Sequence, residues 1–205
     1  MLKKSMLCVA LAGALASGAV LADTRTVSLD WAHANVKNAS DLNGFAIGYQ
    51  HEWDNTQWGV LGTFSYMKGT TDQSYSMPFT SNGRQLEDRG HLSGNVKYYS
   101  LLAGPTYRFN PVFSAYAQLG LAHVKADVDW RWLNHERGNY VERGHGSESK
   151  DTTSLAYAVG VKFDVAKNFS VNVGYEGTNA SIDAPHNIKG FDKFNGWRLG
   201  VGYSF

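Results

Sequence analysis

The sequence predicts an all-β protein, an eight-stranded antiparallel up-and-down β-barrel that spans a membrane. Eight segments of the 205-residue chain alternate apolar residues with small or polar ones, which is the period of a β-strand. The connections between these segments are short and long in turn, as in outer-membrane barrels, where tight turns lie on one side and long loops on the other. We find no convincing helical stretch after the first 22 residues, so strands are expected to carry the whole fold.

The N-terminus carries the pattern of a secretory signal peptide. Two lysines precede an almost wholly apolar or small stretch over 6–21, and Val20-Leu21-Ala22 fits the cleavage rule of leader peptidase. We expect cleavage after Ala22, which separates a signal peptide at 1–22 from a barrel domain at 23–205. A membrane anchor is the alternative, but the apolar stretch is shorter than the roughly 20 residues of a spanning helix.

The expected strands follow one another along the rest of the chain. They lie at 24–36, 45–50, 60–66, 99–108, 114–121, 155–163, 169–176 and 197–205. Tight turns rich in Asp, Asn and Pro are expected at 54–57, 110–111 and 164–168. The longer connections, expected to be extracellular loops, lie at about 37–43, 69–94, 125–152 and 179–194. An even number of strands returns both termini to the periplasmic side.

The two faces of these strands differ in a way that favours a membrane. One face is apolar over a long run and carries aromatic residues near its ends, typical of interfacial belts: Trp53, Trp58, Tyr66, Tyr99, Tyr107, Tyr175 and Trp197. The other face is mostly Gly, Ser, Thr and Ala, which suits the narrow interior of an eight-stranded barrel. A soluble exported sandwich or lipocalin-like binder is the alternative.

A few charges fall on the face expected to line the lumen. They are Glu52, Arg108, Lys162, Glu176 and Arg198. A charge in a narrow interior needs a partner or water, so we expect a structural ion-pair network that fills the lumen. A proton or ion path through the lumen stays open as the functional alternative.

The C-terminal strand ends in an alternating pattern with Tyr203 and a final Phe205. This pattern resembles the assembly signal of bacterial outer-membrane barrels, and Tyr203 and Phe205 are its expected determinants. The barrel assembly machinery is therefore an expected partner, together with outer-membrane lipid and lipopolysaccharide.

Four motifs resemble those of one family, in order and in spacing. They are Ala103-Gly104-Pro105-Thr106-Tyr107-Arg108, Phe113-Ser114-Ala115-Tyr116-Ala117, Val173-Gly174-Tyr175-Glu176-Gly177 and Gly200-Val201-Gly202-Tyr203-Ser204-Phe205. With the leader, they resemble the Ail/OmpX/Lom family of small outer-membrane barrels over the whole mature chain, and the Lom type of lambdoid prophages looks most similar. The resemblance implies host-cell adhesion, invasion or resistance to complement. These activities vary among members and do not follow from the fold.

The long connections are the expected place of function, although 69–94 and 125–152 match no pattern of the family. Arginine and tryptophan are typical anchors of protein interfaces. The candidate binding residues are Arg84, Arg89, Trp130, Arg131, Trp132, Arg137, Arg143 and Lys150. Asn82-Gly83 is expected to form a tight turn that lets the flanking strands continue above the membrane as a hairpin. Equally open is that these charges are a solvated face or contact lipopolysaccharide phosphates.

Chemistry at a catalytic or metal site is not expected. The seven histidines fall in different strands and loops without close His-x-x-x-His spacing, and the only cysteine, Cys8, lies in the leader. His145-Gly146-Ser147-Glu148 holds the residue types of a lipid A hydrolase. It lies in an expected loop, where no rigid strand would hold the groups in catalytic geometry. His123 is expected on the outward face near the outer rim.

The composition excludes one further class of partner. A formal net charge of +1 gives no nucleic-acid footprint, so no nucleic acid is expected. We expect no cofactor and no enzymatic activity, and a monomer. The resemblance implies host cell-surface, matrix or complement-regulator proteins as ligands. A structural envelope barrel without a specific ligand is the first alternative, and a lipid A-modifying enzyme is the second.

Overall fold

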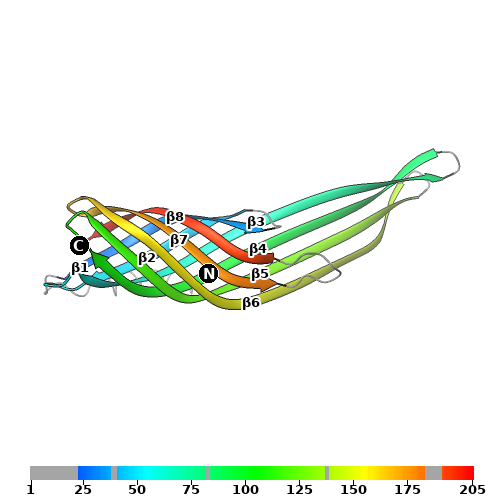
Figure 1. The fold of residues 1–205 in the computed structure, drawn as a ribbon. Coiled ribbons are helices and arrows are strands. Elements are labelled where there is room, and N and C mark those ends of the chain that lie inside the picture. Colours follow the sequence, from blue (N-terminus) through cyan, green and yellow to red (C-terminus); the bar gives the residue numbers. More distant parts are fainter. Residues whose placement is uncertain (1–22, 38–40, 82–83, 137–138, 183–190) are drawn as a thin grey trace, which may run out of the picture.

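Eight antiparallel strands close into a barrel in which the first strand pairs with the last (Figure 1). The computed structural model describes residues 23–37, 41–81, 84–136, 139–182 and 191–205. The strands are β1 (Thr24–Lys37), β2 (Leu42–Glu52), β3 (Trp58–Ser81), β4 (Arg84–Arg108), β5 (Phe113–Glu136), β6 (Asn139–Ala166), β7 (Phe169–Ile182) and β8 (Phe191–Ser204). The predicted up-and-down barrel is therefore confirmed. The expected signal peptide lies outside the described residues.

The four shorter strands have the length that a membrane requires. Strands β1, β7 and β8 have 14 residues each and β2 has 11. At about 3.3 Å per residue and a tilt of about 45°, such strands cross an apolar band roughly 25 Å tall. Among the described residues, no helix is both long and apolar enough to cross a membrane.

Tight turns join the strands at one end of the barrel, at the three places that the sequence predicts. The turn after β2 requires a positive φ, which Asn55 adopts at 57°. Asparagine tolerates this left-handed conformation better than most residues. The side chain of Asp23 also holds this turn, because its Oδ1 accepts a hydrogen bond of 3.1 Å from the backbone N–H of Asp54.

The outward face of the barrel is apolar and the inward face is polar, the reverse of a water-soluble barrel. Leu119 is 74% exposed and Leu155 is 77% exposed on the outside. Ser65, Ser100 and Gln118 are buried inside. Closure pairs the strand edges that would otherwise present unsatisfied backbone groups to lipid.

Aromatic rings gather on the outward face at both ends of this apolar band. At the turn end, the rings of Trp58 and Tyr107 lie 4.9 Å apart. At the opposite end, Tyr66 and Tyr99 lie 5.0 Å apart, and Trp197 forms an edge contact of 4.8 Å with Trp31. These two groups have the form of the predicted interfacial belts.

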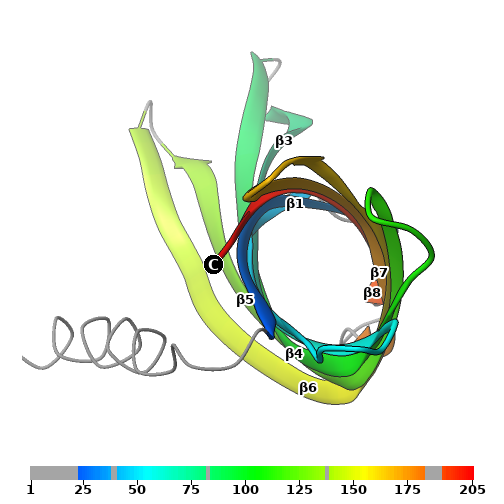
Figure 2. The same ribbon diagram turned by 90° about the vertical axis from the view of Figure 1, so that its left-hand side faces the viewer.

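Strands β3 to β6 run far beyond the closed ring, with 24 to 28 residues each. They leave the barrel on the side opposite the tight turns (Figure 1). The ring that is seen end-on in Figure 2 is formed by β1, β2, β7 and β8 together with the parts of β3 to β6 nearest the tight turns. The segments 69–94 and 125–152, expected as loops, are thus largely strand. The period-two signal there was obscured because both faces of these extensions carry polar residues. Pairing of β3 with β4 continues to Ser81 and Arg84, as the expected hairpin requires, and Asn82-Gly83 itself lies outside the described residues.

Candidate functional site

The four long strands form a sheet that stands beyond the membrane-spanning ring. We call it the protruding sheet and define it as residues 68–81, 84–97, 125–136 and 139–151. It begins directly after the cross-strand row Tyr66, Tyr99, His123 and Thr153. Its outer face continues the lipid-facing side of the barrel, and its inner face continues the lumen side. The alternation is kept because the β5–β6 ladder has no register shift before Trp132/Leu133.

The outer face carries charged and imidazole groups in cross-strand rows. One row consists of Ser74, His91, Arg131 and His145. The Glu142 carboxylate lies beside this row, 3.4 Å from Arg131 Nε and 2.7 Å from His145 Nδ1. A hollow in this region is lined by His91, Ser93, Asp129, Trp130, Arg131, Glu142, His145, Gly146 and Ser147. The arrangement offers a polar surface of mixed charge rather than an enclosed pocket.

Arg89 is held in a cluster near the tip of the sheet. Its Nε donates a 2.8 Å hydrogen bond to Glu87 Oε1, and its guanidinium lies 4.4 Å from the centre of the Tyr140 ring. The Tyr140 hydroxyl donates to the same Glu87 oxygen at 3.1 Å. The hydrogen bond from Arg89 holds the pKa of Glu87 below its ordinary value, and the Tyr140 hydroxyl adds to the effect. Arg89 therefore connects the first residues of β4 to β6 through its contact with Tyr140.

The two candidate tryptophans lie on the opposite, inner face. Trp130 pairs with Leu92 on β4 and Gly146 on β6. Trp132 follows two residues later and its ring lies 6.4 Å from that of Tyr75. The sequence pattern Trp130-Arg131-Trp132 is thus divided between two faces of one strand, although Trp130 and Arg131 both line the hollow described above.

The remaining candidates do not join a common site. Lys150 lies on the inner face, 3.7 Å from Glu148. Arg143 is exposed beside the register shift in the β5–β6 ladder. The backbone of Arg84 belongs to β4, but its side chain and the whole of Arg137 lie outside what the structure describes. The structure therefore spreads the predicted residues over both faces and the tip.

A row of lysines at the base of the outer face is not among the binding residues predicted from the sequence. Lys68 pairs with Lys97, and Lys97 pairs with Lys125. Like charges directly opposite each other destabilise a sheet unless an anion lies between them. Lys125 Nζ is 3.6 Å from Asp127, a contact within the sheet. The pKa of this carboxyl is lowered, first by a hydrogen bond from Ser149 and then by Lys125 and Lys97. The sequence does hold a signal for this row, because each lysine lies two residues from an outward-facing aromatic or imidazole ring.

The five charges expected in the lumen fall into two separate groups. In the first, near the tight turns, Lys162 Nζ donates a 3.0 Å hydrogen bond to Glu52 Oε1. Arg108 also donates to Glu52, through Nη2. Both cations lie near Asp164, with Arg108 at 3.7 Å and Lys162 at 3.6 Å. Two cations and two carboxylates thus neutralise one another at this end of the lumen.

The second group lies in the middle of the lumen around Glu176 and Arg198, which are each only 3% exposed. The Glu176 carboxylate accepts hydrogen bonds from Tyr98 at 2.6 Å and from Ser65 at 3.0 Å, and another from Ser100. Arg198 Nη1 lies 3.5 Å from Glu176 Oε2.

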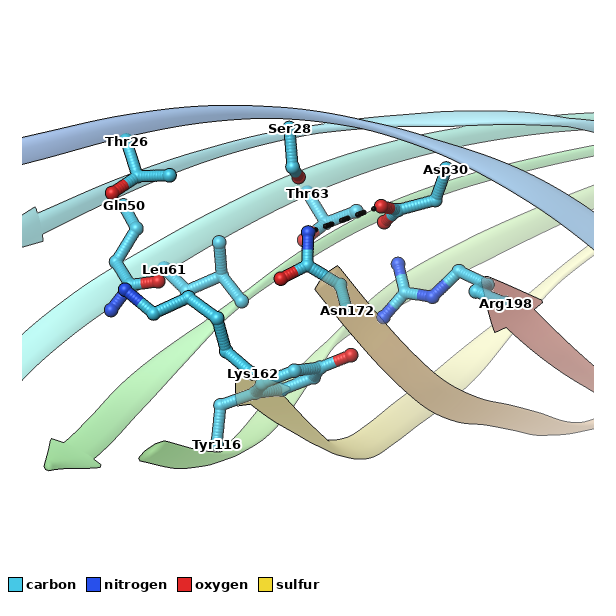
Figure 3. Close-up of a pocket in the computed structure, with 10 residues that line it drawn as sticks. All are labelled: Thr26, Ser28, Asp30, Gln50, Leu61, Thr63, Tyr116, Lys162, Asn172 and Arg198. Atoms are coloured by element: carbon cyan, nitrogen blue, oxygen red, sulfur yellow. Dashed lines mark hydrogen bonds between the residues drawn. The ribbon is translucent and has the colours of Figure 1, made fainter. Parts of the chain in front are cut away.

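Several lumen residues of this middle region were missed by the sequence analysis. Arg198 Nη2 donates to Gln118 Oε1 at 3.3 Å, and Asn172 Nδ2 donates to Asp30 Oδ1 at 3.3 Å. Figure 3 shows Arg198 and Asp30 facing the same small pocket, which Tyr116 also lines. The pocket volume of about 20 Å³ has room for about one water molecule. The sequence signal for Gln118, Asn172 and Asp30 is a polar residue at a lumen-facing position of the period-two pattern.

An apolar layer closes the lumen towards the protruding sheet. It contains Leu42, Met67, Tyr98, Val124 and Phe194, all buried, and the rings of Tyr98 and Phe194 lie 5.8 Å apart. Side chains therefore fill the lumen over three successive layers, one apolar and two charged.

The histidines whose side chains the structure describes do not converge on a metal site or an enclosed catalytic site. Within the described ranges, no three His, Cys, Asp or Glu residues lie close enough to hold a metal ion. His123 faces outward at the rim as expected, with Nδ1 2.9 Å from Thr153 Oγ1. His145 and Ser147 lie on a regular strand, so the expectation of a loop without rigid support is wrong. The acid beside His145 is Glu142, and the His145 side chain is 76% exposed.

Comparison with known proteins shows where this barrel belongs. The family profile described as "Outer membrane protein beta-barrel domain" matches residues 5–205. The chain is 33% identical to the "Attachment invasion locus protein" of Yersinia enterocolitica, with all of both chains covered. It is 27% identical to "Outer membrane protein X" of Escherichia coli K12, again over all of both chains. The chain belongs to the Ail/OmpX family of outer-membrane β-barrels.

The solved structures agree with this assignment. The crystal structure of Ail from Yersinia pestis, in complex with the heparin analogue sucrose octasulfate, is similar with a TM-score of 0.61 and 28% identity. The similarity covers 90% of this chain and 100% of that one. Membership of the Ail/OmpX family makes this an outer-membrane protein. A special closeness to the Lom type stays a prediction.

Proposed function

We propose that this Ail/OmpX barrel attaches the bacterium to host surfaces through its protruding sheet, and that this contact serves adhesion, invasion or survival in serum. The observation that carries the proposal is the sheet itself: four strands continue well beyond the membrane-spanning ring with exposed side chains on both faces. A barrel that only filled the membrane would need none of this length. The name of the Yersinia enterocolitica relative, attachment invasion locus protein, supports the same function.

The edges of the protruding sheet add to its capacity for binding. The β2–β3 ladder ends at Lys68, so among the described residues no strand pairs with 69–81 on that side. The β6–β7 ladder ends at Ala156, and no described residue pairs with the same edge of β6 in the protruding sheet. Open edges present unpaired backbone groups, and partner segments can add to them as further strands.

The test removes the sheet and keeps the barrel. Lys68 pairs with Lys97 and Lys125 pairs with Asp151, so an Asn-Gly turn can replace 69–96 and 126–150 without a change of register. Bacteria of a non-adherent strain that produce this variant should bind cultured epithelial cells no better than bacteria without the protein. The full chain should increase binding. Retention of the heat-dependent shift in electrophoretic mobility confirms that the variant barrel is folded.

Two outcomes would contradict the proposal. If the truncated barrel supports attachment as well as the full chain, the protruding sheet is not the binding region. If the full chain itself adds no attachment and no serum survival, the alternative of a structural envelope barrel is favoured. Mass spectrometry of lipid A from the same strains tests the enzymatic alternative, because a hydrolase or acyltransferase alters the acyl pattern.

A second contact, to lipopolysaccharide, is favoured by the lysine row. Lys68, Lys97 and Lys125 follow the outward aromatic row, at the level where the polar headgroups of the outer leaflet begin. Phosphate groups there offset the repulsion between the paired lysines. We expect the triple change of these lysines to glutamine to lower the thermal stability of the barrel in lipopolysaccharide bilayers but not in uncharged detergent. An equal effect in both media would argue against this contact.

A further inference from the structure

The inner face of the protruding sheet carries aromatic rings that lie flat over glycines. A Cβ atom added to Gly146 would come within 2.6 to 2.8 Å of three atoms of the Trp130 indole, and one added to Gly144 within 3.3 Å. A Cβ atom added to Gly90 would come within 2.4 Å of the Tyr75 ring. Both rings thus occupy the space of missing side chains on the neighbouring strand.

Each of these rings keeps one face open. Trp130 is 47% exposed and Tyr75 is 44% exposed, although one side of each ring rests on a neighbouring strand. Trp132 lies in the same row as Tyr75, opposite Gly90 and Gly144, and follows Trp130 by two residues on β5; its ring is tilted by 49° to that of Tyr75. The result is a surface of rings across β3 to β6, which we call the aromatic platform: Tyr75, Trp130 and Trp132. Rings held in this way lose little conformational freedom when a ligand stacks on them.

The charges of the two faces differ. The inner rows Gln73–Leu92–Trp130–Gly146 and Tyr75–Gly90–Trp132–Gly144 contain no group that is charged at neutral pH. The outer row directly behind them contains Arg131, flanked by His91 and His145. The outer face also holds Glu142 and Asp129, so it presents charges of both signs, whereas an uncharged ligand matches the platform.

We propose that the aromatic platform binds uncharged sugar rings of glycans on the surface of another cell. The apolar C–H face of a pyranose stacks on the electron-rich face of an indole or phenol ring. Gln73 lies in the same row as Trp130, where its amide can bond to sugar hydroxyls. The inference deepens the proposed attachment function and rests on it.

The position of the platform selects the source of the glycan. The outer face continues the lipid-facing side, so it meets the lipopolysaccharide that surrounds the barrel. The platform lies on the other side of the sheet, and about nine residues of strand, roughly 30 Å, separate Tyr75 from the aromatic row at Tyr66. This height above the headgroups, on the side turned away from the surrounding lipid, favours a glycan that another cell presents.

The test is a titration of the full chain in lipid nanodiscs with two uncharged tetrasaccharides, lacto-N-neotetraose and chitotetraose, and with a heparin tetrasaccharide. Saturation-transfer NMR and calorimetry report binding. Trp130→Ala removes a ring, and Gly146→Val keeps the ring but displaces it. Each should weaken binding of the uncharged sugars about tenfold or more, as for a buried aromatic anchor. Asp72→Ala is the matched control, because Asp72 precedes Gln73 on the opposite face, does not line the hollow beside Trp130, and should leave uncharged-sugar binding unchanged.

The outcomes separate this inference from the proposed function. If neither uncharged sugar binds the parent protein, or if Trp130→Ala and Asp72→Ala affect that binding equally, the platform is not a sugar site. If Trp130→Ala abolishes attachment to cells but no sugar binds, the platform binds a protein, so the inference fails while the attachment function stands. If sugars bind and the truncated barrel still attaches, the attachment function fails.

Discussion

Replacing Glu176 by alanine tests whether the middle charged group holds the barrel together. The change removes the acceptor of hydrogen bonds from Tyr98, Ser65 and Ser100. It also removes the carboxylate that lies 3.5 Å from Arg198. Arg198 is only 3% exposed, so its charge would stay in the lumen without that partner.

The expected cost follows from these contacts. Breaking a buried ion pair by removal of one partner costs about 3–5 kcal/mol, because the remaining charge is uncompensated. The hydrogen bonds to the carboxylate act on the same group, so their separate values of about 1.5–3 kcal/mol do not add to this figure. We therefore expect Glu176→Ala to lower the free energy of unfolding by about 3–5 kcal/mol.

A double-mutant cycle gives the decisive measurement. Urea unfolding of the barrel in lipid vesicles, followed by tryptophan fluorescence, should give a smaller loss for Glu176→Ala/Arg198→Ala than the sum of the two single losses. The expected difference is about 1–3 kcal/mol. The reasoning is refuted if Glu176→Ala costs less than about 1 kcal/mol, or if the single losses simply add.

Three further predictions concern other parts of the chain. Gly200→Val should prevent assembly of the folded barrel in a heat-mobility assay, because a Cβ atom there would lie 1.9 Å from Asp30 Oδ1. Gly62→Val is the control and should assemble normally, since a Cβ atom there meets nothing within 4 Å. Equal yields of folded barrel from the two variants would contradict this prediction. The pKa of Glu87 is lowered from its ordinary value of 4.5, so the ion pair with Arg89 is fully formed above pH 4.5. The pair is lost only when the pH falls through the lowered pKa of Glu87. An NMR titration of the protruding sheet should therefore show a midpoint below 4.5, and a midpoint above it would be inconsistent with the pair. Because three layers of side chains fill the lumen, purified protein in planar bilayers should give no steady single-channel current, and sizeable regular steps would show an open path.

Much of the fold could be predicted because a membrane imposes a period of two on each strand. The outward aromatic and aliphatic residues mark where each strand crosses the lipid, and tight turns mark one side. For this reason the sequence pattern alone predicts the strands around Phe64, Leu101 and Leu155. Beyond the membrane the constraint ends, since both faces of a strand then meet water. The pattern in the extensions of β3 to β6 consequently predicts loops, and the structure has strands there.

The sequence by itself determined that this is a closed barrel and which residues face lipid, because those features depend on neighbours along one strand. Only the tertiary structure decided which residues meet across strands. Register sets Trp130 opposite Gly146, aligns Lys68 with Lys97 and Lys125, and brings Glu176 to Arg198. Contacts of this kind depend on the alignment of strands that are distant in the chain, and residue type and spacing do not record that alignment.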